Sequence, residues 1–137
     1  MSHTILIADD SIFIRKALCT LFEREEDFEV CGEAENGKEA IARAKKLHPD
    51  LILLDLSMPV MNGLDAARVL KRMMPKVPVI LFSEYSGTST EKEARSAGAW
   101  ALVSKFAHIS ILLGKARSAL EPQELRRSQS LSTSCRS

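Results

Sequence analysis

The chain has 137 residues, of which 45% are hydrophobic and 27% charged, a balance that suits one domain with a buried core. Its net charge of +1 gives no overall attraction to nucleic acid or anionic lipid, so we expect this chain to bind neither. No apolar stretch approaches the roughly 20 residues of a membrane span, and the start has no signal-peptide pattern. The 3 cysteines cannot all pair with one another, which favours reduced thiols and a cytoplasmic location.

Apolar segments and helical patterns alternate five times along the chain. We expect strands at residues 3–8, 28–34, 51–55, 77–83 and 99–104. Apolar residues at helical spacing predict helices at residues 11–22, 38–47, 64–73 and 107–119. Residues 88–97 predict a short polar helix that stops at Gly98. Asp10 or Ser11 is suited to cap the first helix, and the proline after His48 ends the second.

This order predicts an α/β fold, a doubly wound (βα)5 flavodoxin-like sandwich of three layers. Its parallel sheet has the expected strand order 2-1-3-4-5, with helices on both faces and right-handed crossovers. We expect residues 1–120 to form the domain. Residues 121–137 are rich in Ser and Arg and predict a disordered tail or a truncated linker.

Polar residues follow four of the predicted strands at the point where each strand ends. They are Asp9 and Asp10, then Asp55, Ser83 and Lys105. Because ligand sites of such folds lie beyond the carboxyl ends of the strands, we expect these side chains to converge. Carboxylates held close together repel one another unless a cation lies among them, and an all-oxygen ligand set suits Mg²⁺. A carboxylate can also attack phosphorus and form an aspartyl phosphate.

Each of these residues has an ordinary structural interpretation when it is taken alone. An Asp-Asp pair after a strand often only caps a helix, and a Ser or Lys after a strand is usually a solvated loop residue. The specific signal is the conjunction of all five at the ends of strands 1, 3, 4 and 5. No G-x-G-x-x-G or P-loop pattern follows the first strand, which argues against dinucleotide binding and P-loop chemistry.

Four segments then identify a family resemblance: LIADDS at 6–11, DLILLDLSMPVMNGLDA at 50–66, VILFS at 79–83 and GAWALVSK at 98–105. Together they resemble the receiver domain of two-component response regulators, and the resemblance covers residues 3–119. The strand at 28–34 and its flanks are similar to receivers that precede a helix-turn-helix DNA-binding domain.

The resemblance implies roles for individual residues. Asp55 would accept a phosphoryl group from a sensor histidine kinase or a phosphotransfer protein, with Mg²⁺ as cofactor. Asp10, Asp55 and the backbone carbonyl of Ser57 would bind the ion directly, and Asp9 would bind it through water. Ser83 would supply the switch hydroxyl, and Lys105 would pair with the phosphoryl group.

Three positions depart from the family pattern. Glu84 follows the switch hydroxyl where a small residue is usual, Leu102 stands where an aromatic switch residue is common, and Phe106 replaces the proline after Lys105. A cis peptide after Lys105 is therefore not expected, since without proline it costs about 2.5–4 kcal/mol.

We expect phosphorylation-dependent binding of a downstream protein through the face formed by residues 88–97, 99–104 and 107–119, where Lys92, Arg95, Trp100 and Leu102 are exposed or half-exposed. A homodimer is a further expectation. We expect no enzyme beyond a switch that phosphorylates and dephosphorylates itself. The alternatives are a constitutive interaction module that phosphorylation does not switch, and the receiver half of a DNA-binding transcriptional regulator.

Overall fold

One parallel sheet organises the structure, a computed structural model that describes residues 2–84 and 88–121. Its strands are β1 (His3–Ala8), β2 (Phe28–Ala34), β3 (Leu51–Asp55), β4 (Val79–Ser83) and β5 (Ala101–Ser104). All neighbouring strands pair in parallel, in the order β2-β1-β3-β4-β5. The predicted doubly wound fold and strand order are therefore confirmed.

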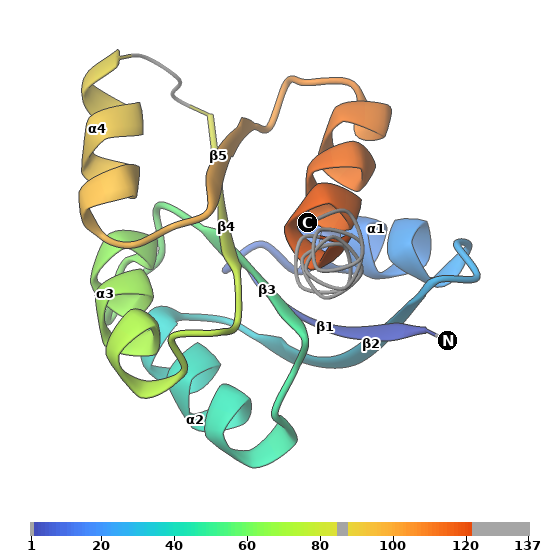
Figure 1. Cartoon of the computed structure of the whole chain (residues 1–137), viewed down its shortest axis with the longest axis horizontal. Coiled ribbons are helices and arrows are strands. Elements are labelled where there is room, and N and C mark those ends of the chain that lie inside the picture. The colour runs from blue at the N-terminus through green and yellow to red at the C-terminus, as the bar shows by residue number, and fades with distance from the viewer. Residues whose placement is uncertain (1, 85–87, 122–137) are drawn as a thin grey trace, which may run out of the picture.

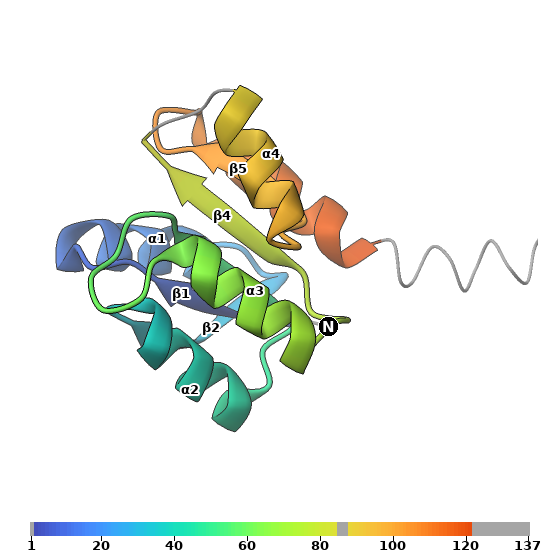
Figure 2. The same cartoon turned by 90° about the vertical axis from the view of Figure 1, so that its left-hand side faces the viewer.

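Helices cover both faces of this sheet (Figure 1). The helices α2 (Gly37–Leu47), α3 (Gly63–Met73) and α4 (Thr88–Ser96) lie on one face. The other face carries α1 (Ile12–Glu23) and a last helix at residues 109–121. Figure 2 turns the face covered by α2, α3 and α4 toward the viewer. Among the described residues, no helix is long and apolar enough to cross a membrane.

Alternation along the strands divides the core between the two faces. In β3, Ile52 and Leu54 pack toward α2 and α3, whereas Leu51 and Leu53 pack toward α1 and the last helix. All five residues of β3 are buried, as are all five of β4. A strand buried on both faces reads as a continuous apolar run, which is why the sequence pattern located β3 correctly.

Three elements begin two residues later than predicted. β4 begins at Val79 instead of residue 77, because Pro78 has no N–H for the ladder and the Val77 N–H bonds to the Met74 carbonyl. β5 begins at Ala101, because the Ala99 N–H bonds back to α4. The last helix begins at residue 109 instead of 107. Beyond residue 121, the predicted tail lies outside the described residues.

Candidate functional site

The carboxyl edge of the sheet gathers every site residue that the sequence predicted. Asp55 and Ser83 are the last residues of β3 and β4, while Asp9 and Lys105 directly follow β1 and β5. One hollow at this edge is lined by all six predicted residues together with Glu84: Asp9, Asp10, Asp55, Ser57, Ser83 and Lys105. The parallel register produces this meeting, since Asp55 pairs with Phe82 and Ser83 pairs with Ser104.

Three carboxylates form an acidic cluster in the hollow: Asp9, Asp10 and Asp55. One carboxylate oxygen of each lies within 4.8 Å of the others. Asp9 and Asp55 are buried, with 0% and 3% of their surface exposed, whereas Asp10 is exposed. Two buried carboxylates and a third beside them are strongly unfavourable without a compensating cation.

Hydrogen bonding satisfies this cluster only in part. Asp9 Oδ1 accepts from the Ser11 N–H at 2.8 Å, which turns the chain into α1, and the Ser11 hydroxyl in turn caps that helix. Asp55 Oδ1 accepts from the Ser57 N–H at 3.2 Å. The second carboxylate oxygen of Asp9, Oδ2, is buried and has no hydrogen-bond partner in the described part of the chain. A buried carboxylate oxygen that no hydrogen bond satisfies is available to a cation, and the Lys105 ammonium already lies beside it.

The Lys105 ammonium is the cation that the structure places in the cluster. Its Nζ lies 3.3 Å from Asp9 Oδ2 and 3.2 Å from Asp55 Oδ1, and only 12% of the side chain is exposed. Burial alone would lower the pKa of this amine, but the carboxylates of Asp55 and Asp9 outweigh burial and raise that pKa above its usual value. One ammonium contacts two of the three carboxylates, so the cluster keeps an excess of negative charge.

This excess affects the pKa of Asp55. Burial, reinforced by the neighbouring Asp9 carboxylate, raises the pKa of Asp55 to about 6, and Lys105 offsets only part of the effect. A further cation among these oxygens would favour the ionised carboxylate, which is the nucleophilic form.

The donor set of the acidic cluster fits a hard divalent cation. Carboxylate and carbonyl oxygens are the ligands that Mg²⁺ prefers, and it commonly takes only one or two carboxylates. Asp9 Oδ2 has no hydrogen bond within the described residues, and the exposed Asp10 lies on the open side of the cluster.

Two further residues support the site, and one of them, Arg15, was not singled out in the sequence. Arg15 is 7% exposed, and it donates to the Asp9 carbonyl at 2.8 Å and to Glu33 at 2.9 Å, which holds the end of β1 in place. Gly63 lies so close to the backbone behind Asp55 that an added Cβ would be 2.3 Å from the Asp55 carbonyl oxygen. Gly63 belongs to the segment 50–66 that carries the family resemblance, whereas the stripe of α1 gave no sign that Arg15 points inward.

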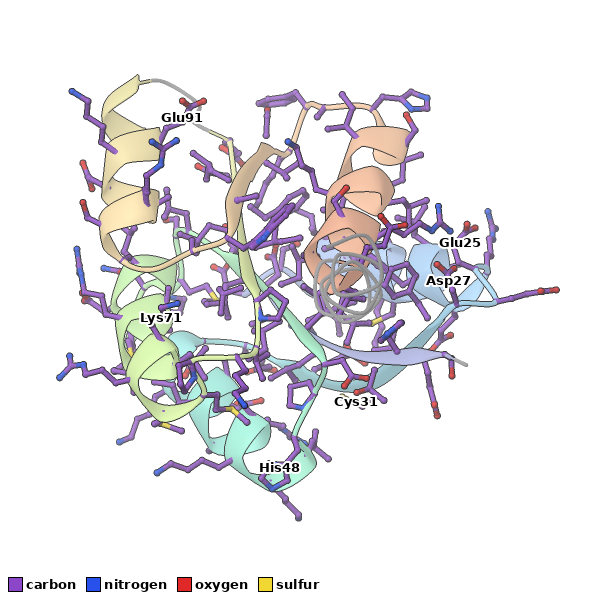
Figure 3. All side chains as sticks on the ribbon, in the orientation of Figure 1. Glu25, Asp27, Cys31, His48, Lys71 and Glu91 are labelled. Carbon is purple, nitrogen blue, oxygen red and sulfur yellow. The ribbon has the colours of Figure 1, made fainter. Side chains whose placement is uncertain are left out.

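The three departures from the family pattern lie around the hollow and the adjacent face. Glu84 is exposed at the hollow. Half-buried Leu102 lines a groove on the α4–β5 face with Trp100, which is 42% exposed. Phe106 is 81% exposed, and no cis peptide bond occurs among the described residues. Figure 3 shows Glu91 on α4, at another part of that groove.

Comparisons with known proteins agree with this geometry. The family model of the response regulator receiver domain matches residues 5–117, so the chain belongs to this family of two-component signalling proteins. The solved response regulator domain of Thermotoga maritima CheB is 33% identical, with a TM-score of 0.73 and coverage of 93% of this chain and 96% of that one. A CheX–CheY–BeF3–Mg complex from Borrelia burgdorferi is 27% identical, with a TM-score of 0.79 and coverage of 85% and 87%.

A curated relative corrects one prediction. The protein-glutamate methylesterase/protein-glutamine glutaminase 1 of Methanosarcina acetivorans is 45% identical over 92 residues, which are 67% of this chain and 26% of that protein. We expected no enzyme beyond a self-phosphorylating switch, and that expectation was wrong in light of relatives named as enzymes. The likeness runs through the receiver region, and this chain spans about a quarter of the relative. A receiver's own residues carry no signature of an activity located elsewhere, which explains the error.

Proposed function

We propose that this chain is a phosphorylation-controlled receiver whose acceptor is Asp55. The observation that carries the proposal is the partly compensated carboxylate itself: Asp55 is 3% exposed, opens into the hollow, and has Lys105 Nζ 3.2 Å away. Structural ion pairs are normally balanced, whereas an acceptor site keeps capacity for an incoming cation and phosphoryl group.

The proposed reaction transfers a phosphoryl group from a phosphohistidine of a sensor kinase or phosphotransfer protein. A carboxylate oxygen of Asp55 forms the new O–P bond as the histidine N–P bond breaks, and the departing imidazole takes up a proton. Lys105 pairs with a phosphoryl oxygen, and the Ser83 hydroxyl donates a hydrogen bond to another. Such transfer depends on positioning and on charge neutralisation. Attack of water on the acyl phosphate then returns the carboxylate and inorganic phosphate.

Asp10, Asp55 and the backbone carbonyl of Ser57 would hold Mg²⁺, with Asp9 contributing through water. When bound, this ion supplies neutralisation of the carboxylates and of the phosphoryl oxygens. The two free cysteines in the described part of the chain, Cys19 and Cys31, support the further proposal of a cytoplasmic location.

The experiment is labelling with a small acyl phosphate donor such as acetyl phosphate, with and without Mg²⁺. We expect one phosphoryl group per chain, dependent on Mg²⁺, and none in Asp55→Asn. Asp65→Asn is the matched control, because Asp65 is an exposed carboxylate on α3 that pairs with Arg68. Label that persists in Asp55→Asn would refute the assignment.

The proposed output surface is the face of α4, β5 and the last helix. Lys92 and Arg95 are exposed there, and Leu102 and Trp100 line its groove. A downstream protein, or a second copy of this chain, would bind this face when Asp55 is phosphorylated. Because curated relatives are named protein-glutamate methylesterases, methylesterase activity is the first activity to assay. The assay is run with and without a beryllofluoride mimic of the phosphoryl group.

A second candidate function is supported by Glu84, Leu102 and Phe106. Without an aromatic residue at 102, movement of Ser83 would not be relayed by ring rotation, and the domain would act as a constitutive interaction module. Partner binding or dimerisation that is identical with and without beryllofluoride would favour this candidate. The receiver half of a DNA-binding regulator remains the third alternative.

A further inference from the structure

The turn between β5 and the last helix carries Lys105 and does so without a proline to fix it. Phe106 occupies the following position, and because its side chain is 81% exposed, burial of the ring does not anchor the turn. Lys105 nevertheless reaches two carboxylates with its Nζ, at 3.2 and 3.3 Å. Other groups must therefore hold the turn.

Ser104 closes the turn from the strand side. Its hydroxyl accepts from the Phe106 N–H at 3.1 Å, and its carbonyl accepts from the Ala107 N–H at 3.1 Å. A serine that bonds the backbone two residues ahead stabilises a tight turn by mimicking a backbone group. Ser104 also pairs in register with Ser83, whose carbonyl accepts from the Lys105 N–H at 2.7 Å.

His108 closes the turn from the helix side. Its Nδ1 accepts from the Ser110 N–H at 3.1 Å and lies 2.8 Å from the Ser110 hydroxyl, while its carbonyl accepts from the Ile111 N–H. The imidazole thus takes the part of the N-cap side chain, which is Ser11, Asn36 or Asn62 in three other helices of this chain. This capping explains why the helix begins at residue 109.

We propose that Ser104 and His108 are positioning residues that fix the Lys105 turn from its two sides and so set the distance from Nζ to Asp55. The inference rests on the proposed role of Lys105 in phosphoryl transfer. Both residues act through Lys105, because their polar contacts in the structure are to the turn and to the helix start. Loss of the Ser104 hydroxyl frees the Phe106 N–H next to Lys105, and loss of the His108 imidazole frees the Ser110 N–H at the start of the helix that ends the turn. Displacements of an ångström can change a transfer rate by up to about a hundredfold.

The test compares Ser104→Ala and His108→Ala with the conservative variants Ser104→Thr and His108→Ser, which retain an acceptor. The matched control is Asn36→Ala, which removes the Asn36 cap from the Glu39 N–H of α2. The rate of Mg²⁺-dependent labelling is measured over a range of acetyl phosphate concentrations, and the urea midpoint is measured for every variant. We expect each alanine at 104 or 108 to lower the maximal labelling rate about tenfold, with the conservative variants close to wild type. Asn36→Ala shifts the midpoint and leaves the rate unchanged.

Labelling at the wild-type rate in both alanine variants, with only the urea midpoint lowered, would overturn the inference. If the wild-type chain takes no label at Asp55, the proposed function fails, and a double-mutant cycle still decides the positioning roles. In that cycle, His108→Ala is combined with Lys105→Met and stability is measured. Non-additive changes support positioning of Lys105 by His108, and strict additivity contradicts it.

Discussion

Two clusters of charge lie at different places in this molecule and are built in opposite ways. The acidic cluster holds Asp9 and Asp55 away from water with one ammonium for three carboxylates. The second cluster, called here the Arg117 latch, joins the last helix to the loop after α1 through Arg117, Glu25 and Asp27. Its ion-pair contacts are 2.7 and 2.8 Å long, and its side chains are 32–42% exposed. Figure 3 labels Glu25 and Asp27 in that loop.

The difference separates a structural role from a functional one. In the latch the one guanidinium of Arg117 contacts both carboxylates, and all three side chains have access to water, so the cluster contributes modestly to stability and little else. In the acidic cluster, burial without full compensation makes the native state less stable than it could be. Such an arrangement is expected where charge is needed for binding or chemistry.

The largest expected difference concerns removal of one carboxylate from each cluster. Asp55→Asn should abolish labelling and raise the free energy of unfolding at pH 7 by about 1–3 kcal/mol, because the raised pKa of Asp55 marks an unfavourable buried charge. Asp27→Asn should take up label normally, and its free energy of unfolding should fall by less than about 1 kcal/mol. Urea unfolding of both variants checks this, and destabilisation by Asp55→Asn would contradict it.

A methyl group added behind the acidic cluster should lower the free energy of unfolding by about as much as Asp55→Asn raises it. In Gly63→Ala, the new Cβ would lie 2.3 Å from the Asp55 carbonyl oxygen, so backbone must move and stability should fall by about 3 kcal/mol. Gly114→Ala is the control on the last helix, where a Cβ has nothing within 4 Å. Thermal unfolding should show the control stabilised by about 0.5–1 kcal/mol.

Magnesium should stabilise the chain through the acidic cluster alone. At a concentration a hundred times Kd, binding would add about 2.7 kcal/mol to the free energy of unfolding. The gain should disappear in Asp10→Asn and persist in Asp27→Asn. The same titration with Ca²⁺ serves as a comparison. Equal stabilisation of both variants by Mg²⁺ would mean that the ion binds outside the acidic cluster.

Acid titration should affect the two clusters in opposite directions. The hydrogen bond from Arg117 holds the pKa of Asp27 below its usual value, so the latch contributes above about pH 4 and is lost as the pH falls further. The pKa of Asp55 is raised to about 6. The stability that its protonated form contributes is therefore fully present below about pH 4 and is lost as the pH rises through 6. Without Mg²⁺, Asp55→Asn should remove the slope between pH 4 and 6 from the stability profile. An unchanged slope would contradict the raised pKa.

Much of the site was predictable, because parallel strands bring their carboxyl ends to one edge. That rule alone predicts that Asp9, Asp55, Ser83 and Lys105 lie together. Arg15 was not predictable in the same way, since a long cationic side chain on a helix usually lies in solvent, and here the Asp9 carbonyl and Glu33 draw it inward. The His108 cap was missed because histidine is not among the usual N-cap residues.

The sharpest measurement identifies the labelled residue chemically. The chain is incubated with acetyl phosphate and Mg²⁺, reduced with borohydride so that an aspartyl phosphate becomes homoserine, and mapped by peptide mass spectrometry. We predict homoserine at position 55 alone. Modification at Asp9, Asp10 or another carboxylate, or none at all under conditions that label an active receiver, would contradict the assignment of the acidic cluster as a phosphoryl acceptor site.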